Sequence, residues 1–183
     1  SKHRIWIGAA DGLYLLNKEN GTFKSYRNNE PDTASLSNDI IYRIAEDNNG
    51  QLWVATKNGL NRFNPETGKF NRYRHDANNS KSIGADWIKT VYRDSRNRIW
   101  VGTQGGGVAL FNPHDNSFTN FRHDEKNSKS ICHDDILSFA EDSDGKLWVG
   151  TENGGISVLQ NDQHTFITYK YDFSNASSLS NNS

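Results

Sequence analysis

Residues 35–74 read SLSNDIIYRIAEDNNGQLWVATKNGLNRFNPETGKFNRYR, and this stretch decides the fold. It holds four short segments rich in β-branched and aromatic residues, a composition that favours strands. These segments are 41–47, 52–56, 60–63 and 69–74, and turn sequences such as DNNG and NPETG separate them. Because no part of the chain shows a sustained helical period, the sequence predicts an all-β protein with almost no helix.

The pattern of this stretch returns along the whole chain. A tryptophan recurs in steps of 47 or 48 residues, as Trp6, Trp53, Trp100 and Trp148. Three further series keep the same step: Phe23, Phe70, Phe118 and Phe166; Tyr26, Tyr73, Phe121 and Tyr169; and Leu36, Ile83, Ile131 and Leu179, each after a serine. Four parallel series indicate tandem repeats.

Repeats with four strands each and a tryptophan on one strand are typical of β-propeller blades. We predict a single β-propeller domain over residues 1–183, with about four blades of four antiparallel strands. The repeats are expected at about 1–34, without a first strand, and at 35–81, 82–129 and 130–177, with 178–183 starting a next repeat. Since the first blade lacks a strand, we expect the chain to form part of a larger ring.

The turns carry residues that tolerate a positive φ. The turn between the first two strands of a repeat ends on Gly50, Asn97 or Gly145, and the turn before the fourth strand holds Gly21, Gly68, Asn116 or His164. We therefore predict a positive φ at these positions. The fourth strand is the most polar, so we expect its outer edge to face water.

The composition excludes several functional classes. Hydrophobic residues make up 33% of the chain and aromatic residues 11%, with five tryptophans, which argues against disorder. The net charge is −1 and no run of Lys or Arg occurs, so no nucleic-acid partner is expected. No apolar stretch is long enough to span a bilayer, so no direct membrane contact is expected. The absence of Met indicates a processed or excised segment, and the single Cys132 excludes an internal disulfide.

The repeats resemble the two-component regulator propeller repeat. That repeat combines Ser-Leu-Ser, a strand ending in Glu-Asp, a glycine turn, Leu-Trp-Ile-Gly-Thr, Gly-Leu and Asn/Asp-Pro-x-Thr-Gly-x-Phe. The second repeat is the closest copy, at 35–37, 46–47, 50, 52–56, 59–60 and 64–70. The departures are modest, for example Ala55 in place of the usual glycine of the tryptophan strand.

The resemblance implies a location and a role. Such repeats form the periplasmic sensor region of membrane histidine kinases, often hybrid ones of Bacteroidetes, whose ligands are typically breakdown products of polysaccharides. The resemblance thus implies a periplasmic ligand-binding fragment of a two-component receptor. Its expected partners are an oligosaccharide and the rest of the receptor ectodomain, and neither a cofactor nor catalysis by the fragment is expected.

Positions that differ among the repeats mark the candidate site. The first strands are expected to line the central channel, and the positions that vary there include the sets Asn38, Ala85 and His133; Ile40, Trp87 and Asp135; and Tyr42, Lys89 and Leu137. The loops after the tryptophan strands also vary and are expected to open on the same rim. A sugar site requires an aromatic face with a few polar groups. We predict ligand-binding roles for Lys57, Trp87, Gln104, His133, Asp135 and Glu152, with a solvated rim as the alternative.

Other conspicuous residues favour structural roles. The repeated tryptophans are expected in the core. His75 and His123 occupy equivalent repeat positions, which favours a loop with a local Asp turn over a metal site. Residues 142–145 read DSDG but lack the further ligands of a calcium loop, so a hairpin turn is expected and no metal is predicted.

Two alternative functions remain open. The apolar ends of a partial ring favour a structural role in which the repeats mediate receptor dimerisation, including closure of a ring by two copies. The other alternative is a propeller lyase or glycosidase. No pair of carboxylates recurs at a catalytic spacing, although a propeller site is assembled from distant loops.

Overall fold

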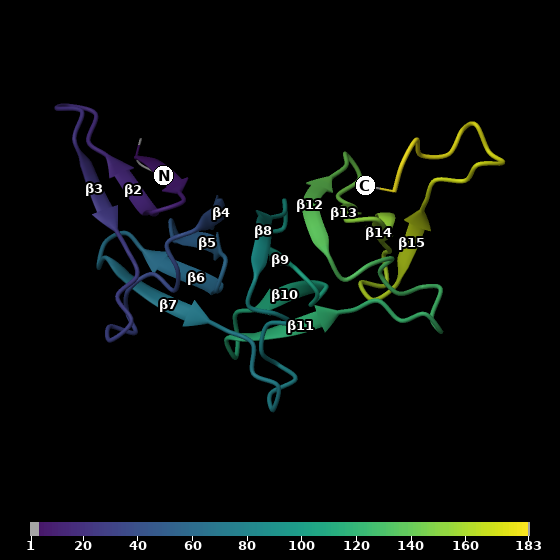
Figure 1. The fold of residues 1–183 in the computed structure, drawn as a ribbon, viewed down its shortest axis with the longest axis horizontal. Coiled ribbons are helices and arrows are strands. Elements are labelled where there is room, and N and C mark those ends of the chain that lie inside the picture. The colour runs from purple at the N-terminus through teal and green to yellow at the C-terminus, as the bar shows by residue number, and fades with distance from the viewer. Residues whose placement is uncertain (1–3, 183) are drawn as a thin grey trace.

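The computed structural model describes residues 4–182, and these residues form four antiparallel sheets. The sheets follow one another along the chain and lie side by side in an open arc (Figure 1). Within this range no segment is helical. The prediction of an all-β fold built from propeller blades is confirmed, and the sheets do not close into a ring.

Each sheet is a meander of neighbouring strands. The first blade has three strands, β1 (Ile5–Ala9), β2 (Gly12–Leu16) and β3 (Phe23–Tyr26). The other blades have four: β4 (Ile41–Glu46), β5 (Leu52–Thr56), β6 (Gly59–Asn64) and β7 (Lys69–Tyr73); β8 (Ile88–Arg93), β9 (Ile99–Thr103), β10 (Val108–Asn112) and β11 (Ser117–Phe121); and β12 (Ile136–Glu141), β13 (Leu147–Thr151), β14 (Gly155–Leu159) and β15 (Phe166–Tyr169). The strands predicted in the second repeat are present, with ends that differ by at most one residue.

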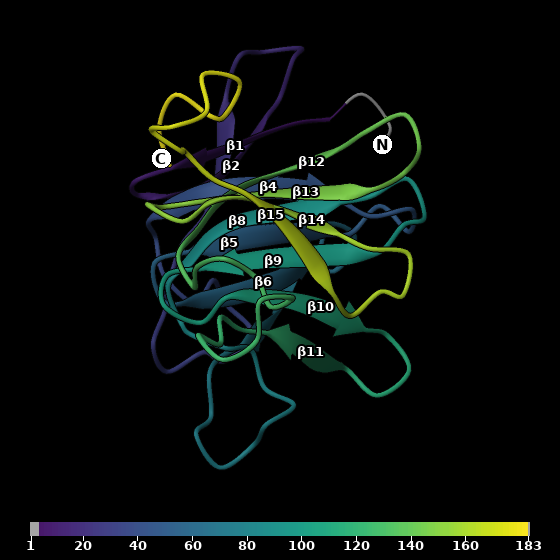
Figure 2. The ribbon, with the colours of Figure 1, turned by 90° about the vertical axis from the view of Figure 1, so that its right-hand side faces the viewer.

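The first strands β4, β8 and β12 lie on the inner side of the arc, and β7, β11 and β15 lie on the outer side (Figure 1). The view turned by 90° shows that the connecting loops and turns gather on two opposite sides of the sheets (Figure 2). The strands β5 and β9 are buried along their whole length because a neighbouring blade covers each face. Full coverage explains why these strands are apolar without alternation.

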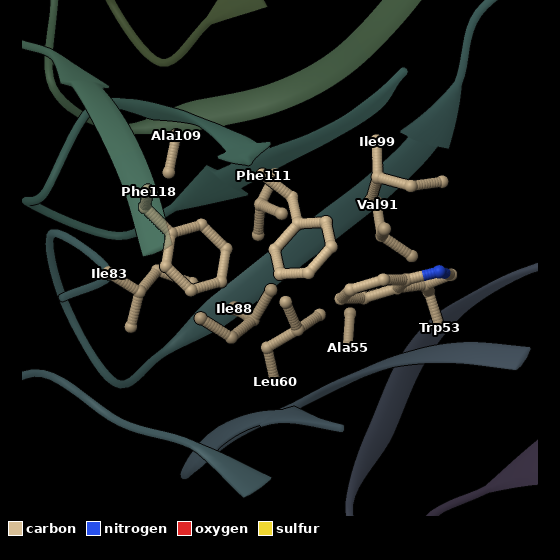
Figure 3. Close-up of a cluster of buried hydrophobic side chains, with 11 residues drawn as sticks. Trp53, Ala55, Leu60, Ile83, Ile88, Val91, Ile99, Ala109, Phe111 and Phe118 are labelled. Carbon is tan, nitrogen blue, oxygen red and sulfur yellow. The ribbon is translucent and has the colours of Figure 1, made fainter. Parts of the chain in front are cut away.

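Aromatic side chains fill the space between blades. Trp53 of the second blade stacks on Tyr73 and lies 4.6 Å, between ring centroids, from Phe111 of the third blade. Phe118 of the third blade meets Tyr73 edge to face at 5.4 Å. Figure 3 shows Trp53, Phe111 and Phe118 within one cluster of buried side chains. Burying such large rings supplies much of the stability of small β-sheets.

The four repeated tryptophans differ in burial, and those in the middle of the arc are the most deeply buried. Trp53 and Trp100 are buried, which confirms the prediction for these two residues. Trp6 and Trp148 lie in the first and last blades and are half-buried. The difference follows from position, because an end blade has a neighbour on one side only.

In each four-stranded blade a carboxylate links the first hairpin turn to the tryptophan. The indole Nε1 of Trp100 donates to Asp94 Oδ2 at 2.9 Å, while Asp94 Oδ1 accepts the backbone N–H groups of Arg96 and Arg98. The same arrangement occurs in the second blade with Asp47 and in the fourth with Asp142. The DSDG segment is therefore a hairpin turn, as predicted.

The long loops between blades also repeat one arrangement. The backbone N–H groups of the residues that open each loop donate to a side-chain oxygen near its end, in the pairs Asn28–Asp39, His75–Asp86, His123–Asp134 and Tyr171–Asn182. The Nδ1 atoms of His75 and His123 lie 2.9 and 2.8 Å from the carbonyl oxygens of Ile83 and Ile131. The interpretation of the two histidines as loop residues is confirmed.

Two sequence expectations need correction. His164 was predicted to have a positive φ, but Gln163 takes that conformation with φ 61°. This turn closes earlier, because Gln163 N donates to the carbonyl three residues before it (Gln160 O), whereas Gly68 N donates to the carbonyl four residues before it. Gly50, Asn97 and Gly145 do have a positive φ, and so do the other members of the second set, Gly21, Gly68 and Asn116. The outer edge of β7 does not face water throughout, because Phe70 N donates to Ala34 O of the preceding loop at 2.8 Å.

Candidate functional site

The inner strand of every four-stranded blade begins with a β-bulge. Its pairing register with the next strand shifts between Ile41 and Arg43 in β4, between Ile88 and Thr90 in β8, and between Ile136 and Ser138 in β12. The residues inside these shifts are Tyr42, Lys89 and Leu137. A bulge leaves one residue outside the ladder and redirects its side chain, so each blade presents one such side chain at its inner edge.

Trp87 is the centre of a group of side chains from the second and third blades. The Nζ atoms of Lys89 and Lys57 lie over its ring, 4.6 and 5.6 Å from the centroid. The ring of Tyr42 lies 6.2 Å from that of Trp87, at an interplanar angle of 32°. We call Tyr42, Lys57, Trp87 and Lys89 the Trp87 cluster. Cations over an indole face are held by its quadrupole, so the arrangement is stabilising in itself.

Backbone hydrogen bonds place the loops after the tryptophan strands beside the ends of the long loops. Gln104 N donates to Trp87 O at 2.9 Å, Glu152 N donates to Asp135 O at 2.9 Å, and Lys57 N donates to Ile40 O at 3.1 Å. The two kinds of loop therefore open on one rim, as expected from the sequence.

His133, Asp135 and Glu152 form a second group on the fourth blade. Asp135 N donates to His133 Nδ1 at 3.1 Å. The Nδ1 atom is thus an acceptor, so its 3.9 Å separation from Asp135 Oδ2 does not represent a charged pair. Gly105, which follows Gln104 in the third blade, lies beside this second group, because a Cβ there would lie 3.9 Å from Asp135 Oδ1.

The structure therefore distributes the six predicted residues along one rim. Trp87 contacts Lys57 through side chains and Gln104 through the backbone, and Asp135 contacts His133 and Glu152. None of these six side chains belongs to the buried core of the described residues. Residues of these types supply charges, amides and an aromatic ring for binding a polar ligand.

Sequence reasoning placed Tyr42 and Lys89 in a variable series but not in the site. Their signal was the change of residue type from blade to blade at one position, Tyr42, Lys89 and Leu137. The two bulges that contain Tyr42 and Lys89, in β4 and β8, have no signature in the residues that form them.

A hollow of about 690 Å³ on the opposite rim was also missed. Turns of the second blade form most of its wall, with Arg4 from the first blade and Arg93 from the third. Asn48 N donates to Asn97 Oδ1, and Arg93 hydrogen-bonds Asn48, so the third blade fixes one side of the hollow. The hollow leaves no signal in the sequence, because turns from different repeats build it.

Two features are not found among the residues that the structure describes. Among residues 4–182 no group of three His, Cys, Asp or Glu side chains is placed to hold a metal ion. In the same range no helix has the length and apolar character needed to cross a membrane.

The meandering four-stranded sheets, their inner strands and their loop-bearing rims define this chain as a segment of a β-propeller. The two component regulator propeller family matches residues 35–58, 82–105 and 130–153. These three segments match that family, which confirms the resemblance inferred from the sequence. No curated protein matches the chain.

Solved structures from Bacteroides thetaiotaomicron are similar over nearly the whole chain. One is the extracellular domain of a proposed hybrid two component system, BT4673, with 28% identity, a TM-score of 0.77 and coverage of 99% of this chain and 23% of that chain. The extracellular domain of a second proposed system, BT3049, has 23% identity, a TM-score of 0.72 and coverage of 92% and 22%.

A third similar structure is PorZ, a surface component of the type-IX secretion system of Porphyromonas gingivalis. It has 18% identity, a TM-score of 0.54 and coverage of 90% of this chain and 31% of that chain. The likenesses to PorZ and BT3049 show the fold alone. This chain spans 23% of the length of the BT4673 structure that it matches.

Proposed function

We propose that this chain is a ligand-sensing propeller segment of the extracytoplasmic part of a two-component receptor, and that its rim binds an oligosaccharide. The observation that carries the proposal is a row of polar and aromatic side chains on one rim that are not part of the buried core. The row consists of Lys57, Trp87, Gln104, His133, Asp135 and Glu152. The 28% identity with the BT4673 extracellular domain supports the sensor role and the extracytoplasmic location.

The chemistry of the row suits sugar hydroxyl groups. Asp135, Glu152 and Gln104 supply acceptors and an amide, and the backbone bonds that tie their loops to the long loops limit their freedom before binding. A preformed set of polar groups loses less conformational entropy on binding than a mobile set. Because no pair of carboxylates recurs at a catalytic spacing in the sequence, we propose binding without turnover.

Thermal unfolding with a panel of neutral and acidic oligosaccharides tests this function. A ligand that binds the native state raises the midpoint in a dose-dependent way. We expect a rise for one class of sugar, and we expect Trp87→Ala to abolish it. Phe173→Ala is the matched control, because Phe173 lies on the loop 170–182 and is 93% exposed. An unchanged midpoint with every sugar would contradict the proposal.

A further inference from the structure

The two lysines of the Trp87 cluster come from different blades and converge on one ring. Lys57 follows β5 of the second blade, and Lys89 is the bulged residue of β8 in the third. Neither takes part in an ion pair among residues 4–182, whereas Arg122 on the same rim is paired with Asp134 at 3.3 Å. Both ammonium groups instead lie over the ring of Trp87.

This placement changes what Trp87 offers to a ligand. Both Nζ atoms lie over the ring and Tyr42 lies beside it, so the indole is not a free platform for stacking a sugar. The cluster instead presents two ammonium groups with an aromatic backing. Such groups bind carboxylate or sulfate oxygens through charge-assisted hydrogen bonds.

We propose that the Trp87 cluster is the subsite for the acid group of an acidic oligosaccharide, either a uronate carboxylate or a sulfate. The inference rests on the proposed function of the rim and narrows its ligand class. It also gives the ligand an orientation, because Asp135 and Glu152 place carboxylates on the fourth blade. Like charges repel, so the acid group lies at Lys57 and Lys89 and the hydroxyl groups of the chain lie toward Asp135.

An orphan donor in the cluster favours the same ligand chemistry. Nε1 of Trp87 is buried and has no hydrogen-bond acceptor among the described residues. A buried donor without an acceptor costs free energy, so a ligand oxygen that reaches it as the ring adjusts gains more than an ordinary hydrogen bond. An acid group supplies acceptor oxygens and no competing donor.

Titration calorimetry with matched glycans tests the subsite. One pair is an oligogalacturonide and its methyl ester, which lacks the charge but keeps the sugar. The second pair is a sulfated disaccharide and its desulfated form, which separates sulfate from carboxylate recognition. We expect one acidic member to bind about ten-fold or more tightly than its neutral counterpart at low salt, and the preference to weaken as salt rises.

Two double variants test whether the preference for the acidic glycan depends on the lysines of the Trp87 cluster. Lys57→Gln with Lys89→Gln removes both ammonium groups and is expected to abolish the preference for the acidic member. Lys126→Gln with Lys129→Gln makes the same change in net charge on the exposed loop between β11 and β12 and is expected to leave the preference unchanged. Equal losses in the two double variants would overturn the subsite, because the effect would then be one of net charge.

The possible results distinguish a failure of the acid subsite from a failure of the sensor function. Binding of neutral oligosaccharides without any acid preference overturns the subsite and leaves the sensor function in place. No binding of any glycan overturns both. Acid preference that survives Lys57→Gln with Lys89→Gln overturns the subsite by placing acid recognition elsewhere.

Discussion

At the scale of single residues, a carboxylate holds each complete blade's first hairpin together. Asp94 is 2% exposed, accepts Trp100 Nε1, and forms an ion pair of 2.6 Å with Arg98 Nε. It also accepts two backbone N–H groups of its own turn. One side chain thus fixes the turn, the strand after it and the core tryptophan.

Loss of this carboxylate is expected to be costly. Asp94→Ala leaves the Trp100 indole N–H and the Arg98 guanidinium without their acceptor, so we expect the free energy of unfolding to fall by about 3 kcal/mol. Urea unfolding measures the change. Asp144→Ala is the control, since Asp144 is exposed in the equivalent turn of the fourth blade. An equally large loss in the control would show that the turn sequence, and not the buried carboxylate, is responsible.

Acid is expected to loosen the last blade through carboxylates of the same kind. A hydrogen bond from Trp148 lowers the pKa of Asp142. The backbone N–H of His164 and the hydroxyl of Thr165 lower the pKa of Asp162 from 3.8 to about 2. Since the folded pKa lies below the unfolded one, the contribution of Asp162 is present above pH 3.8 and is lost as the pH falls through about 2.

The urea midpoint measured across this range tests the acid response. Asp162→Asn keeps an acceptor for the two backbone N–H groups but does not titrate, so its midpoint should fall less steeply with acid than that of the parent. Identical pH profiles for the two proteins would exclude Asp162 as a source of the acid response.

At the scale of elements, the loops between blades also act as covers for outer strands. The guanidinium of Arg72 in β7 donates to the carbonyl oxygens of Asp32 and Ser35, at 2.7 and 2.8 Å. Asn120 occupies the same position in β11 and donates to Ser82 O at 2.8 Å. An outer strand whose free edge is covered in this way cannot pair along that stretch with another chain.

Removal of the Arg72 guanidinium should loosen the loop between the first and second blades without affecting the other loops. Arg72→Ala is expected to speed amide hydrogen exchange in residues 29–36 with little change in the buried strand β5. Arg72→Lys is expected to behave similarly, because one ammonium cannot reach the set of acceptors that the planar fork spans. Full protection in Arg72→Lys would mean that charge alone holds the loop.

The elements were predictable from the sequence because each leaves a local signal. The strand 52–56 follows from its β-branched and aromatic residues, and the turn at Asn97 follows from tolerance of a positive φ. The bulge at Lys89 and the shift from His164 to Gln163 were not predictable, since pairing register depends on the partner strand. The Trp87 cluster likewise depends on contacts between blades.

At the scale of the whole molecule, the two ends of the arc carry the two complementary faces of the interface that joins neighbouring blades in its interior. In its interior, Phe111 and Phe118 cover the stacked pair Trp53 and Tyr73. In the last blade the equivalent pair, Trp148 and Tyr169, stacks at 5.8 Å, and no further blade of the described chain covers it. In the first blade Leu16 and Phe23 occupy the positions of the two covering phenylalanines, and Phe23 is 55% exposed.

Complementary end faces predict self-association of this chain. We expect light scattering to show a mass that rises with concentration above 20.7 kDa. Phe23→Lys with Ile167→Lys charges both faces and should restore the monomer, because buried charges without partners are costly. Phe173→Lys, on an exposed loop, should not. A monomer at every concentration in the parent chain would exclude association through the end faces and the dimerising role that it supports.

The bulges of the inner strands have a consequence for how such proteins diversify. Tyr42, Lys89 and Leu137 differ widely in size and charge, yet they occupy one structural position in three blades with the same strand pairing. A residue outside the ladder is free to vary without a compensating change in the core. Each four-stranded blade thereby contributes one exchangeable side chain to the inner rim, so the size and charge of groups on that rim can change while the scaffold is kept.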